Sequence, residues 1–301
     1  MQLLYHGLLI IDKPTGMTSR DVVNRVAGWF PRRTRFGHTG TLDPLATGVL
    51  VLCVGNATRL AEYVQDMTKT YRAGLVLGLR SDTNDADGTV ETVANPPVPD
   101  LVQVKKKLAG FLGTIDQVPP DYSAARLAGR RAYQLARRGQ EVELHSRPVR
   151  IDAIDILDFS FPRLDLEIRC GKGTYIRSLA RDLGDQLGCG ALVATLRRTR
   201  VGTFTAEEGL SLEAASSLAQ LKLLPMAAAV ADFPSITLKE TEINRLRQGQ
   251  KIPIADWTKI ENRVIDNLKV AVYDQNNNLV AVAFQDPEKR FLNPCKVFCK
   301  S

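Results

Sequence analysis

The chain has 301 residues, of which 44% are hydrophobic and 24% are charged. This length and composition exclude a disordered or collagen-like chain and are typical of about two globular domains. The 40 Lys and Arg residues outnumber the 33 Asp and Glu residues, which gives a formal net charge of +7. The basic excess is concentrated in residues 20–36 and 121–150, whereas residues 81–100 are acidic. Such clustering favours a polyanionic partner, and a solvated charged face is the alternative.

Cysteine usage and hydropathy indicate where the protein works. Five cysteines, an odd number in a long chain, predict a reducing compartment rather than a disulfide framework. The first residues lack the basic start and apolar run of a signal peptide, and no apolar stretch approaches the roughly 20 residues that span a bilayer. We therefore expect a soluble, cytoplasmic protein. Cys295 and Cys299 lack a second pair of Cys or His ligands, so we expect no metal site.

The N-terminal part begins with a predicted strand over Gly7–Ile11, which is followed by a helix. Thr18 or Ser19 can cap this helix, because the apolar residues that follow recur at helical spacing. The segment Arg32–Gly48 has the composition of a loop, and the apolar run Val49–Val54 after it predicts a central strand.

Further along the chain, helices and strands are interleaved. Lys69–Gly78 predicts a strand and Leu101–Leu112 a helix, with an acidic surface loop between them. The runs Val149–Phe161 and Leu164–Cys170 alternate apolar and polar residues, as a strand pair does, and Thr174–Leu187 predicts an amphipathic helix. Because no regular βαβ repeat is present, we predict an α+β fold rather than a doubly wound sheet.

A second, smaller domain is predicted over residues 234–301, after a first domain of residues 1–233. Its main signal is a pair of alternating runs, Leu268–Tyr273 and Leu279–Phe284, separated by four polar residues that favour a hairpin.

Several standard catalytic signatures are missing from the sequence. It contains no GxGxxG, GxxxxGK[ST], HExxH or GxSxG pattern, so dinucleotide, nucleotide, zinc-protease and serine-hydrolase sites lack their usual local geometry. The segment Gly171–Thr174 before a predicted helix could hold a phosphate with its backbone N–H groups. A tight turn with a helix cap explains the same residues equally well.

The most informative segment is the glycine-rich stretch Gly37–Gly48. Its glycines permit tight or left-handed turns, while Pro44 keeps Asp43 out of helical geometry and so restricts where its carboxylate points. A carboxylate can act as a nucleophile at an electrophilic carbon without a metal or a coenzyme. The alternative is that Asp43 caps a helix that starts at Pro44.

Several motifs, in this order along the chain, resemble the TruB family of tRNA pseudouridine synthases. They are Asp12–Ser19, Gly37–Gly48, Gln117–Ala124, Arg131–Tyr133, Gly171–Leu179 and Leu196–Thr199. A chance match of this many ordered motifs over roughly residues 7–205 is improbable. The resemblance implies the pseudouridine synthase fold, with a central mixed, largely antiparallel sheet, and a small PUA-like β domain at the C-terminus.

The resemblance also implies an activity, the isomerisation of uridine 55 in the T loop of tRNA to pseudouridine. The N-glycosidic bond breaks, the uracil turns and rejoins the ribose through C5, and the C5 proton leaves, so no cofactor is required. The enzyme would have to flip the uridine out of the T loop. The family aspartate either forms a covalent ribose adduct or removes the ribose 2′ proton to give a glycal, and the sequence leaves both routes open.

Three residues match catalytic positions of the family, two of them within these motifs and Tyr71 in the segment Lys69–Arg72. Asp43 matches the catalytic aspartate. Tyr71 matches the tyrosine that stacks on the target base and is a candidate to remove the C5 proton. Arg177 matches the arginine that pairs with the catalytic carboxylate, where its charge would keep Asp43 ionised. Without the resemblance, Tyr71 would be interpreted as a cross-strand packing residue and Arg177 as an exposed helix residue.

Four further residues are expected to bind the substrate or support the site. Tyr175 and Leu196 match positions that line the base pocket, and His38 matches a histidine that holds the T loop with its base extruded. Lys13 is expected to support the active-site region. The basic stretch at about residues 121–150 resembles a thumb insertion that closes over the T arm.

Two other functions remain open at this stage. A related synthase works inside a guide-RNA ribonucleoprotein, although the thumb-like stretch argues against it. An RNA-folding chaperone would need RNA binding alone, but would leave Asp43, Tyr71 and Arg177 unexplained. Chaperone activity and catalysis can also coexist. We expect a monomer that binds tRNA and requires no protein partner, cofactor, metal or membrane.

Overall fold

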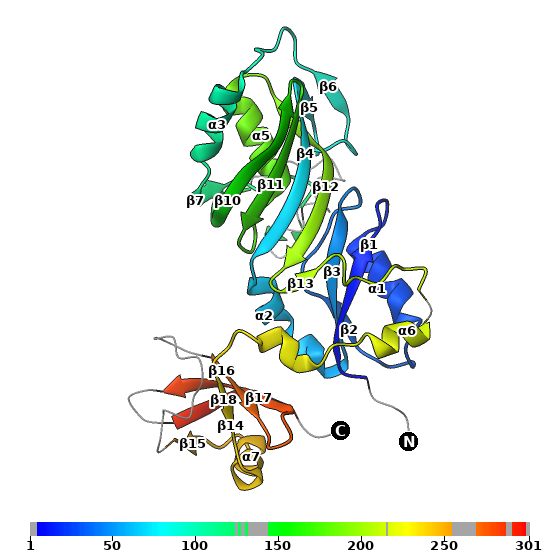
Figure 1. Cartoon of the computed structure of the whole chain (residues 1–301), viewed down its shortest axis with the longest axis vertical. Coiled ribbons are helices and arrows are strands. Elements are labelled where there is room, and N and C mark those ends of the chain that lie inside the picture. The colour runs from blue at the N-terminus through cyan, green and yellow to red at the C-terminus, as the bar shows by residue number, and fades with distance from the viewer. Residues whose placement is uncertain are drawn as a thin grey trace.

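The structure is a computed structural model. It describes residues 5–123, 126–127, 130–131, 144–214, 216–254, 269–286 and 291–298. The described residues form an elongated molecule with a nine-stranded sheet and, at one end, a five-stranded sheet (Figure 1). No helix of this described part is long and apolar enough to cross a membrane.

The larger sheet is mixed and largely antiparallel. Its strands lie in the order β1 (Gly7–Lys13), β3 (Thr47–Val54), β12 (Ala191–Val201), β4 (Lys69–Leu77), β11 (Arg163–Cys170), β10 (Arg147–Ser160) and β7 (Gly113–Gln117), while β2 (Phe36–His38) pairs with β3 and β13 (Phe204–Thr205) with β12. Among these strands, only β3 and β12 pair in parallel. The predicted α+β class and the mixed sheet are therefore confirmed.

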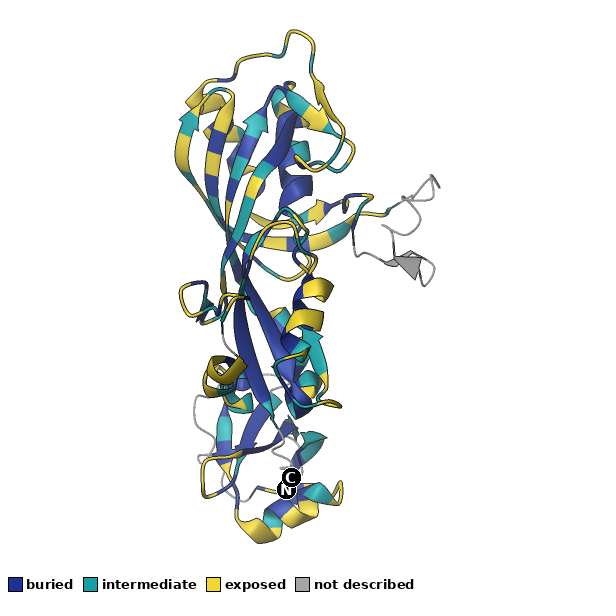
Figure 2. Ribbon diagram, turned by 90° about the vertical axis from the view of Figure 1, so that its right-hand side faces the viewer, coloured by how far each residue is buried: buried dark blue, intermediate teal, exposed yellow. Residues whose placement is uncertain are grey.

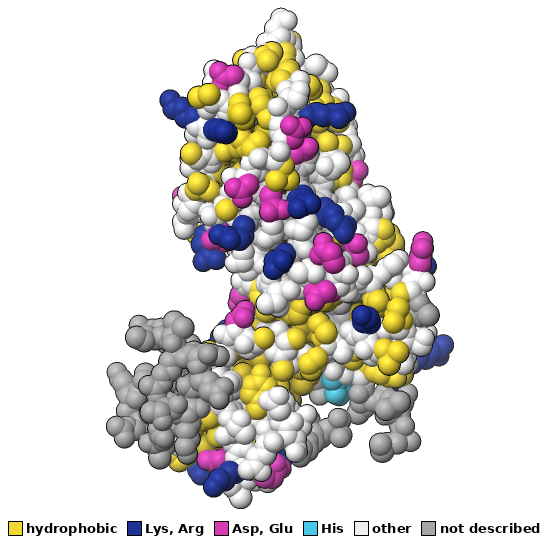
Figure 3. Space-filling model, in the orientation of Figure 1, with side chains coloured by type: hydrophobic (Ala, Val, Ile, Leu, Met, Phe, Trp, Pro, Cys, Tyr) yellow, Lys and Arg dark blue, Asp and Glu magenta, His cyan; other side chains and the backbone are white. Residues whose placement is uncertain are grey.

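Helices α3 (Leu101–Ala109) and α5 (Ile176–Leu187) cover one face of the part of this sheet that contains β4, β11 and β10, and leave the other face of this part open (Figure 1). Strand β11 buries every second side chain from Leu164 to Cys170 against these helices, as its alternating sequence predicts. The central strands are buried, whereas the outer sides of the helices are exposed (Figure 2). On the open face, Lys and Arg are interspersed with Asp and Glu, which is typical of a solvated surface (Figure 3).

Helix α1 (Ser19–Ala27) begins at Thr18, so Thr18 rather than Ser19 is the cap. The Thr18 hydroxyl accepts a hydrogen bond from the Asp21 N–H at 3.2 Å, and the Asp21 carboxylate accepts one from the Thr18 N–H at 3.0 Å. This reciprocal capping box satisfies two N–H groups of the first helical turn. The helix buries Val22, Val23 and Val26 against β1 and β3.

Several strands of the structure, among them β2, β5, β6 and β12, are absent from the sequence prediction. Strand β2 lies in the segment predicted as a loop, and the acidic segment contains a two-stranded sheet of β5 (Leu79–Ser81) and β6 (Val90–Thr92). Each of these three has three residues, too few for an alternating pattern to be recognised. Strand β12 is long, but its second half is rich in Arg and Thr and has little apolar alternation.

The smaller sheet has the strand order β14 (Ser235–Thr237), β16 (Lys269–Tyr273), β17 (Leu279–Asp286), β18 (Phe291–Val297) and β15 (Ile252–Pro253). The predicted hairpin is confirmed, because β16 and β17 pair antiparallel around a turn in which the Asp274 carboxylate accepts from the Asn276 and Asn278 N–H groups. Helix α7 (Glu240–Arg247) contributes Ile243 and Leu246 to its core.

The remaining elements connect the two sheets or lie beside them. They are the 3₁₀ helices η1 (Gly55–Leu60) and η2 (Met226–Val230), helices α2 (Ala61–Asp66) and α6 (Ser216–Leu221), and the short strands β8 (Arg126–Leu127) and β9 (Arg130–Arg131). The smaller sheet docks on α2, where Lys296 forms an ion pair with Glu62 and the Tyr63 ring contacts Phe233 edge to face. One buried cluster contains residues of both sheets, so the two parts share a packed interface.

Candidate active site

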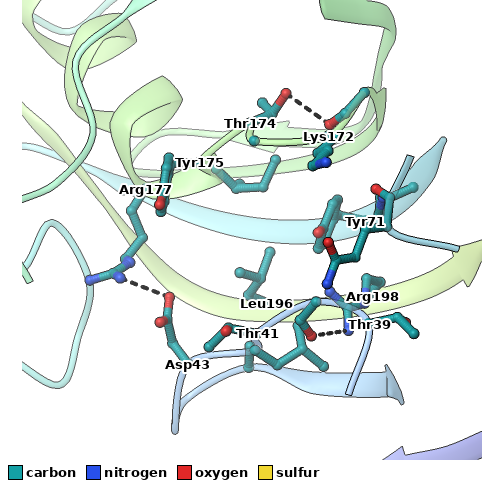
Figure 4. A pocket seen from close by; sticks show the side chains of 18 residues that line it. Thr39, Thr41, Asp43, Tyr71, Lys172, Thr174, Tyr175, Arg177, Leu196 and Arg198 are labelled. Carbon is teal, nitrogen blue, oxygen red and sulfur yellow. Dashed lines mark hydrogen bonds and ion pairs between the residues drawn. The ribbon is translucent and has the colours of Figure 1, made fainter. Parts of the chain in front are cut away.

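A pocket of about 240 Å³ opens where the loop before β3, strands β4 and β12, and the turn before α5 meet (Figure 4). It is lined by Thr39–Asp43, Ala46, Gln65, Lys69, Tyr71, Gly171–Arg177, Leu196 and Arg198. The structure therefore brings together five of the residues singled out from the sequence, namely Asp43, Tyr71, Tyr175, Arg177 and Leu196.

Asp43 lies in a turn of the loop before β3. No helix begins at Pro44; instead the Ala46 N–H donates to the Asp43 carbonyl at 3.1 Å. The buried Ser19 hydroxyl holds the loop, because it donates to the Leu42 carbonyl at 3.0 Å and accepts from the Leu42 N–H at 2.8 Å. The interpretation of Asp43 as a helix cap is therefore wrong, and its side chain is left to line the pocket.

Arg177 forms an ion pair with Asp43, with 2.8 Å between Nη2 and Oδ2. Its guanidinium also lies 3.2 Å from the Asp85 carboxylate and donates to the backbone carbonyls of Thr83 and Tyr122, both at 3.0 Å. The side chain of Arg177 is only 6% exposed, so its interpretation as an exposed helix residue is wrong. The buried face of α5 directs it into the site.

Asp85 is a site residue that sequence reasoning missed. It lies in the acidic segment that the sequence predicts as a surface loop, yet it is buried. Its carboxylate accepts from the Asp87 N–H at 3.1 Å and from the Thr83 hydroxyl at 2.5 Å, which orients it toward Arg177. No local pattern in the sequence singles out Asp85, because the need for a second negative charge beside Arg177 follows from the burial of Arg177, which only the structure shows.

Burial raises the pKa of the Asp43 carboxyl. The charge of Arg177 opposes this effect, and the charge of Asp85 adds to it. Together these effects raise the pKa of Asp43, although 35% of its side chain remains exposed in the pocket. Arg177 thus acts in the expected direction, since it favours the ionised carboxylate, but burial has the larger effect.

Tyr71 and Arg198 occupy another part of the pocket, on strands β4 and β12 (Figure 4). The two residues are direct partners in the pairing of these strands. Burial raises the pKa of the Tyr71 phenol, and the neighbouring Arg198 guanidinium opposes the rise through its charge and a hydrogen bond. Arg198 itself is buried and donates to the carbonyls of Val49 at 2.8 Å and Gly40 at 3.1 Å. Sequence reasoning assigned Arg198 no role, although it lies in the quoted motif Leu196–Thr199.

Comparison with known proteins identifies the family. The family model "TruB family pseudouridylate synthase (N terminal domain)" matches residues 29–176, and "tRNA pseudouridylate synthase B C-terminal domain" matches residues 177–229. The chain is 42% identical to tRNA pseudouridine synthase B of Xanthomonas axonopodis pv. citri (strain 306), over 97% of this chain and 94% of that protein. It is 40% identical to the protein of that name from Syntrophomonas wolfei subsp. wolfei, over 97% and 98%. The chain belongs to the TruB family of pseudouridine synthases. It is thus an isomerase.

Solved structures of other proteins have the same fold. A structure of an H/ACA RNP bound to a substrate RNA containing 2′-deoxyuridine aligns with a TM-score of 0.75 at 24% identity, covering 98% of this chain and 85% of that chain. A Cbf5-Nop10-Gar1 complex aligns with a TM-score of 0.74 at 25% identity, covering 97% and 85%. The predicted pseudouridine synthase fold is therefore confirmed.

Lys13, in the first of the TruB-like motifs, lies beneath the loop of Asp43. Its side chain is fully buried, and its ammonium group donates to the carbonyls of Pro14 at 2.8 Å and Pro44 at 3.3 Å. Burial lowers the pKa of Lys13 to about 8, and the charge of Asp43 opposes that shift. Lys13 does not line the pocket, so its contact with the site runs through the Pro44 carbonyl.

His38, the other TruB-like residue outside the pocket lining, ends strand β2 next to Thr39, which does line the pocket. It pairs with Leu52 of β3, so its place beside the site is set by the sheet.

The segment Gly171–Thr174 forms the tight turn of the second alternative but not its helix cap, because α5 follows Tyr175, whose side chain makes no capping hydrogen bond. The Thr174 hydroxyl donates to the Gly171 carbonyl at 3.2 Å, and the Gly171 N–H donates to the Arg150 carbonyl at 2.8 Å. Gly173 has a φ of 87°, a conformation that favours glycine. Lys172 leaves the turn to form an ion pair of 2.8 Å with Asp66, at the end of α2.

Proposed function

We propose that this protein isomerises uridine 55 in the T loop of tRNA to pseudouridine. The relatives named tRNA pseudouridine synthase B support tRNA as the substrate. The observation that carries the proposal is the ion pair between Asp43 and Arg177 in a pocket that Tyr71 and Leu196 also line. A carboxylate in this setting can react at the ribose C1′ while an apolar wall and an aromatic ring contact the base.

The uridine must leave the T loop before it can enter the pocket. Extrusion costs a few kcal/mol of stacking, which contacts to the ring of Tyr71 and the apolar wall of Leu196 and Tyr175 would offset. His38, beside the pocket, would hold the loop in its opened form.

Asp43 would begin the reaction at the ribose. In the covalent route its carboxylate bonds to C1′ as the C1′–N1 bond breaks, and the bonding electron pair leaves with N1 of the uracil. In the glycal route it removes the 2′ proton instead, and the same C1′–N1 bond breaks. A rate that falls when the 2′ hydrogen is replaced by deuterium would favour the glycal route, and an unchanged rate the covalent route.

Tyr71 would complete the reaction. After the uracil turns, C5 bonds to C1′. In the covalent route the Asp43–C1′ bond breaks as this bond forms and its electron pair returns to the carboxylate, and in the glycal route Asp43 returns the proton to C2′. The C5 proton must then leave while N1 gains a proton. Because the pKa of Tyr71 is raised, its side chain is a neutral phenol at pH 7. Its oxygen would therefore accept the C5 proton as the phenol proton passes on to solvent or to N1, so that the phenol acts as a relay.

The wider organisation of the enzyme is proposed from the family resemblance. Residues 1–233 would form the catalytic domain and residues 234–301 a PUA-like domain. The thumb at about residues 121–150 would contact the T arm, but residues 124–125, 128–129 and 132–143 lie outside the described residues. We further propose a cytoplasmic monomer that also helps tRNA to fold.

A direct test is to incubate the purified protein with an unmodified tRNA transcript and to map pseudouridine by carbodiimide treatment and reverse transcription. A single stop at the T-loop uridine supports the proposed reaction and position. A transcript with cytidine at that position is the matched control. Binding without modification would favour a chaperone or guide-dependent enzyme, the latter because complexes of this kind share the fold.

A further inference from the structure

In the nine-stranded sheet, β3 and β12 are joined by only a short stretch of strand pairing. These strands pair at two positions only, Thr47 with Arg197 and Gly48 with Arg198, whereas β12 and β4 pair along most of their length. We call the junction of Thr47–Gly48 with Arg197–Arg198 the seam. The backbones approach closely there, because a Cβ on Gly48 would lie 2.1 Å from the Arg198 carbonyl oxygen.

The active site is assembled from both sides of the seam. Asp43 comes from the loop that leads into β3, on one side. Tyr71 on β4 and Leu196 on β12 belong to the other side, as does Arg177 on α5 (Figure 4). The distance between Asp43, which acts on the ribose, and Tyr71, which acts on the base, therefore depends on how firmly β3 and β12 are held together at the seam.

Two consecutive arginines of β12 bond across the seam. Arg198 lines the active-site pocket and donates to the Val49 carbonyl and to the Gly40 carbonyl in the loop of Asp43. Arg197 makes two hydrogen bonds to the Asp12 carboxylate of β1, at 3.0 and 2.9 Å. Successive side chains of a strand point to opposite faces, so these bonds close the seam from its two faces.

Arg197 is separated from the substrate site. It lines a different pocket, together with Thr15 and Arg72, and is not part of the lining that contains Asp43 and Tyr71. A planar guanidinium that bonds a carboxylate at two points fixes orientation as well as distance, which a single lysine contact cannot do.

We propose that Arg197 and Arg198 are positioning residues for the isomerisation, which hold the seam closed from its two faces and so set the place of Asp43 relative to Tyr71. The inference rests on the proposed function. Since Arg197 lies away from the pocket, its contribution to the rate comes through the geometry of the sheet.

The test compares ion pairs that cross the seam with one that does not. Arg197→Gln and Asp12→Asn each break the pair across the seam. Arg72→Gln is the matched control, because the Arg72–Glu167 pair of 3.0 Å joins β4 to β11 on one side of the seam. We expect Arg197→Gln to slow pseudouridine formation in a single turnover by about tenfold to a hundredfold, with the tRNA dissociation constant unchanged.

A rescue experiment distinguishes a positioning role of Arg197 from a general loss of structure in the variant. The exchanged pair, Asp12→Arg with Arg197→Asp, should restore the single-turnover rate to within about threefold of the wild type, because the contact is rebuilt with its charges reversed. On the pocket face, Arg198→Lys should lose less rate than Arg198→Met, since lysine can still donate to one of the two carbonyls and methionine to neither.

Amide hydrogen exchange tests the seam without any activity. Peptides that cover Thr47–Val49 should exchange faster in Arg197→Gln than in Arg72→Gln. A rate in Arg197→Gln within about twofold of the Arg72→Gln control overturns the positioning role, whatever the exchange shows. If the wild type itself forms no pseudouridine, the proposed function fails. If, in that case, amide exchange over Thr47–Val49 is also the same in Arg197→Gln and Arg72→Gln, Arg197 does not hold β3 against β12 either.

Discussion

The guanidinium of Arg177 lies 2.8 Å from the Asp43 carboxylate, and the two residues come from opposite sides of the seam. The same guanidinium also forms an ion pair with the buried carboxylate of Asp85 and donates hydrogen bonds to the backbone carbonyls of Thr83 and Tyr122. Arg177 is therefore fixed by the protein before it meets Asp43. A fixed cation of this kind can orient a reacting carboxylate without reorganising during the reaction.

Replacing the carboxylate tests the central role of Asp43. Asp43→Asn should abolish pseudouridine formation, because an amide neither attacks C1′ nor removes a proton, while tRNA affinity stays within about threefold of the wild type. Carbodiimide mapping and filter binding give the two quantities. Asp116→Asn, at an exposed carboxylate of β7, is the control. Turnover near the wild-type rate in Asp43→Asn would remove Asp43 from the reaction.

Loss of the second carboxylate should weaken the hold on Arg177. Asp85→Asn keeps the shape but removes a buried negative charge, so we expect a slower reaction and a free energy of unfolding lower by about 1–3 kcal/mol. Urea unfolding and single-turnover rates measure these effects. Asp87→Asn changes an exposed neighbour and should match the wild type in both. Equal stability of the Asp85 and Asp87 variants would show that Arg177 does not depend on Asp85.

The pH dependence of the reaction should report on Asp43. The carboxyl works only when ionised, and its pKa is raised, so activity should fall with decreasing pH sooner than for an ordinary aspartate. Arg177 lowers this pKa, so Arg177→Gln should move the acid limb of kcat/KM to higher pH and reduce the maximum rate. Arg163→Gln, at an exposed arginine of β11, should leave the limb in place. A shift to lower pH in Arg177→Gln would contradict this electrostatic account.

Buried Lys13 should make stability depend on alkaline pH. Its pKa is about 8 in the folded protein and near 10.5 in the unfolded chain, so the unfolded chain binds more protons between these values. The contribution of Lys13 to stability should therefore rise with pH over this range, by at most about 3 kcal/mol.

Urea unfolding at pH 7.5 and 10 measures the slope for Lys13. The slope should be smaller in Lys13→Met than in the wild type, whereas Lys105→Met, at an exposed lysine of α3, should keep the wild-type slope. Equal slopes in all three proteins would show that Lys13 is not held at a lowered pKa.

The sequence by itself determined the elements whose pattern is local. Alternation predicted the pair of β10 and β11, helical spacing predicted α1, and a polar turn between apolar runs predicted the β16–β17 hairpin. The ordered motifs predicted the family and the pseudouridine synthase fold, and glycine and proline marked the loop of Asp43. Each of these features is encoded by neighbouring residues, so it can be recognised without the rest of the chain.

Only the tertiary structure decided which charged side chains contact one another. The contact of Arg177 with Asp85, and the bonds of Arg197 and Arg198 across the seam, join segments that are distant in the sequence. Such contacts leave no periodic pattern, because a single side chain makes each of them and its partner depends on the order of strands in the sheet. Asp85 therefore looked like part of a solvated acidic loop until the fold buried it beside an arginine that needs its charge.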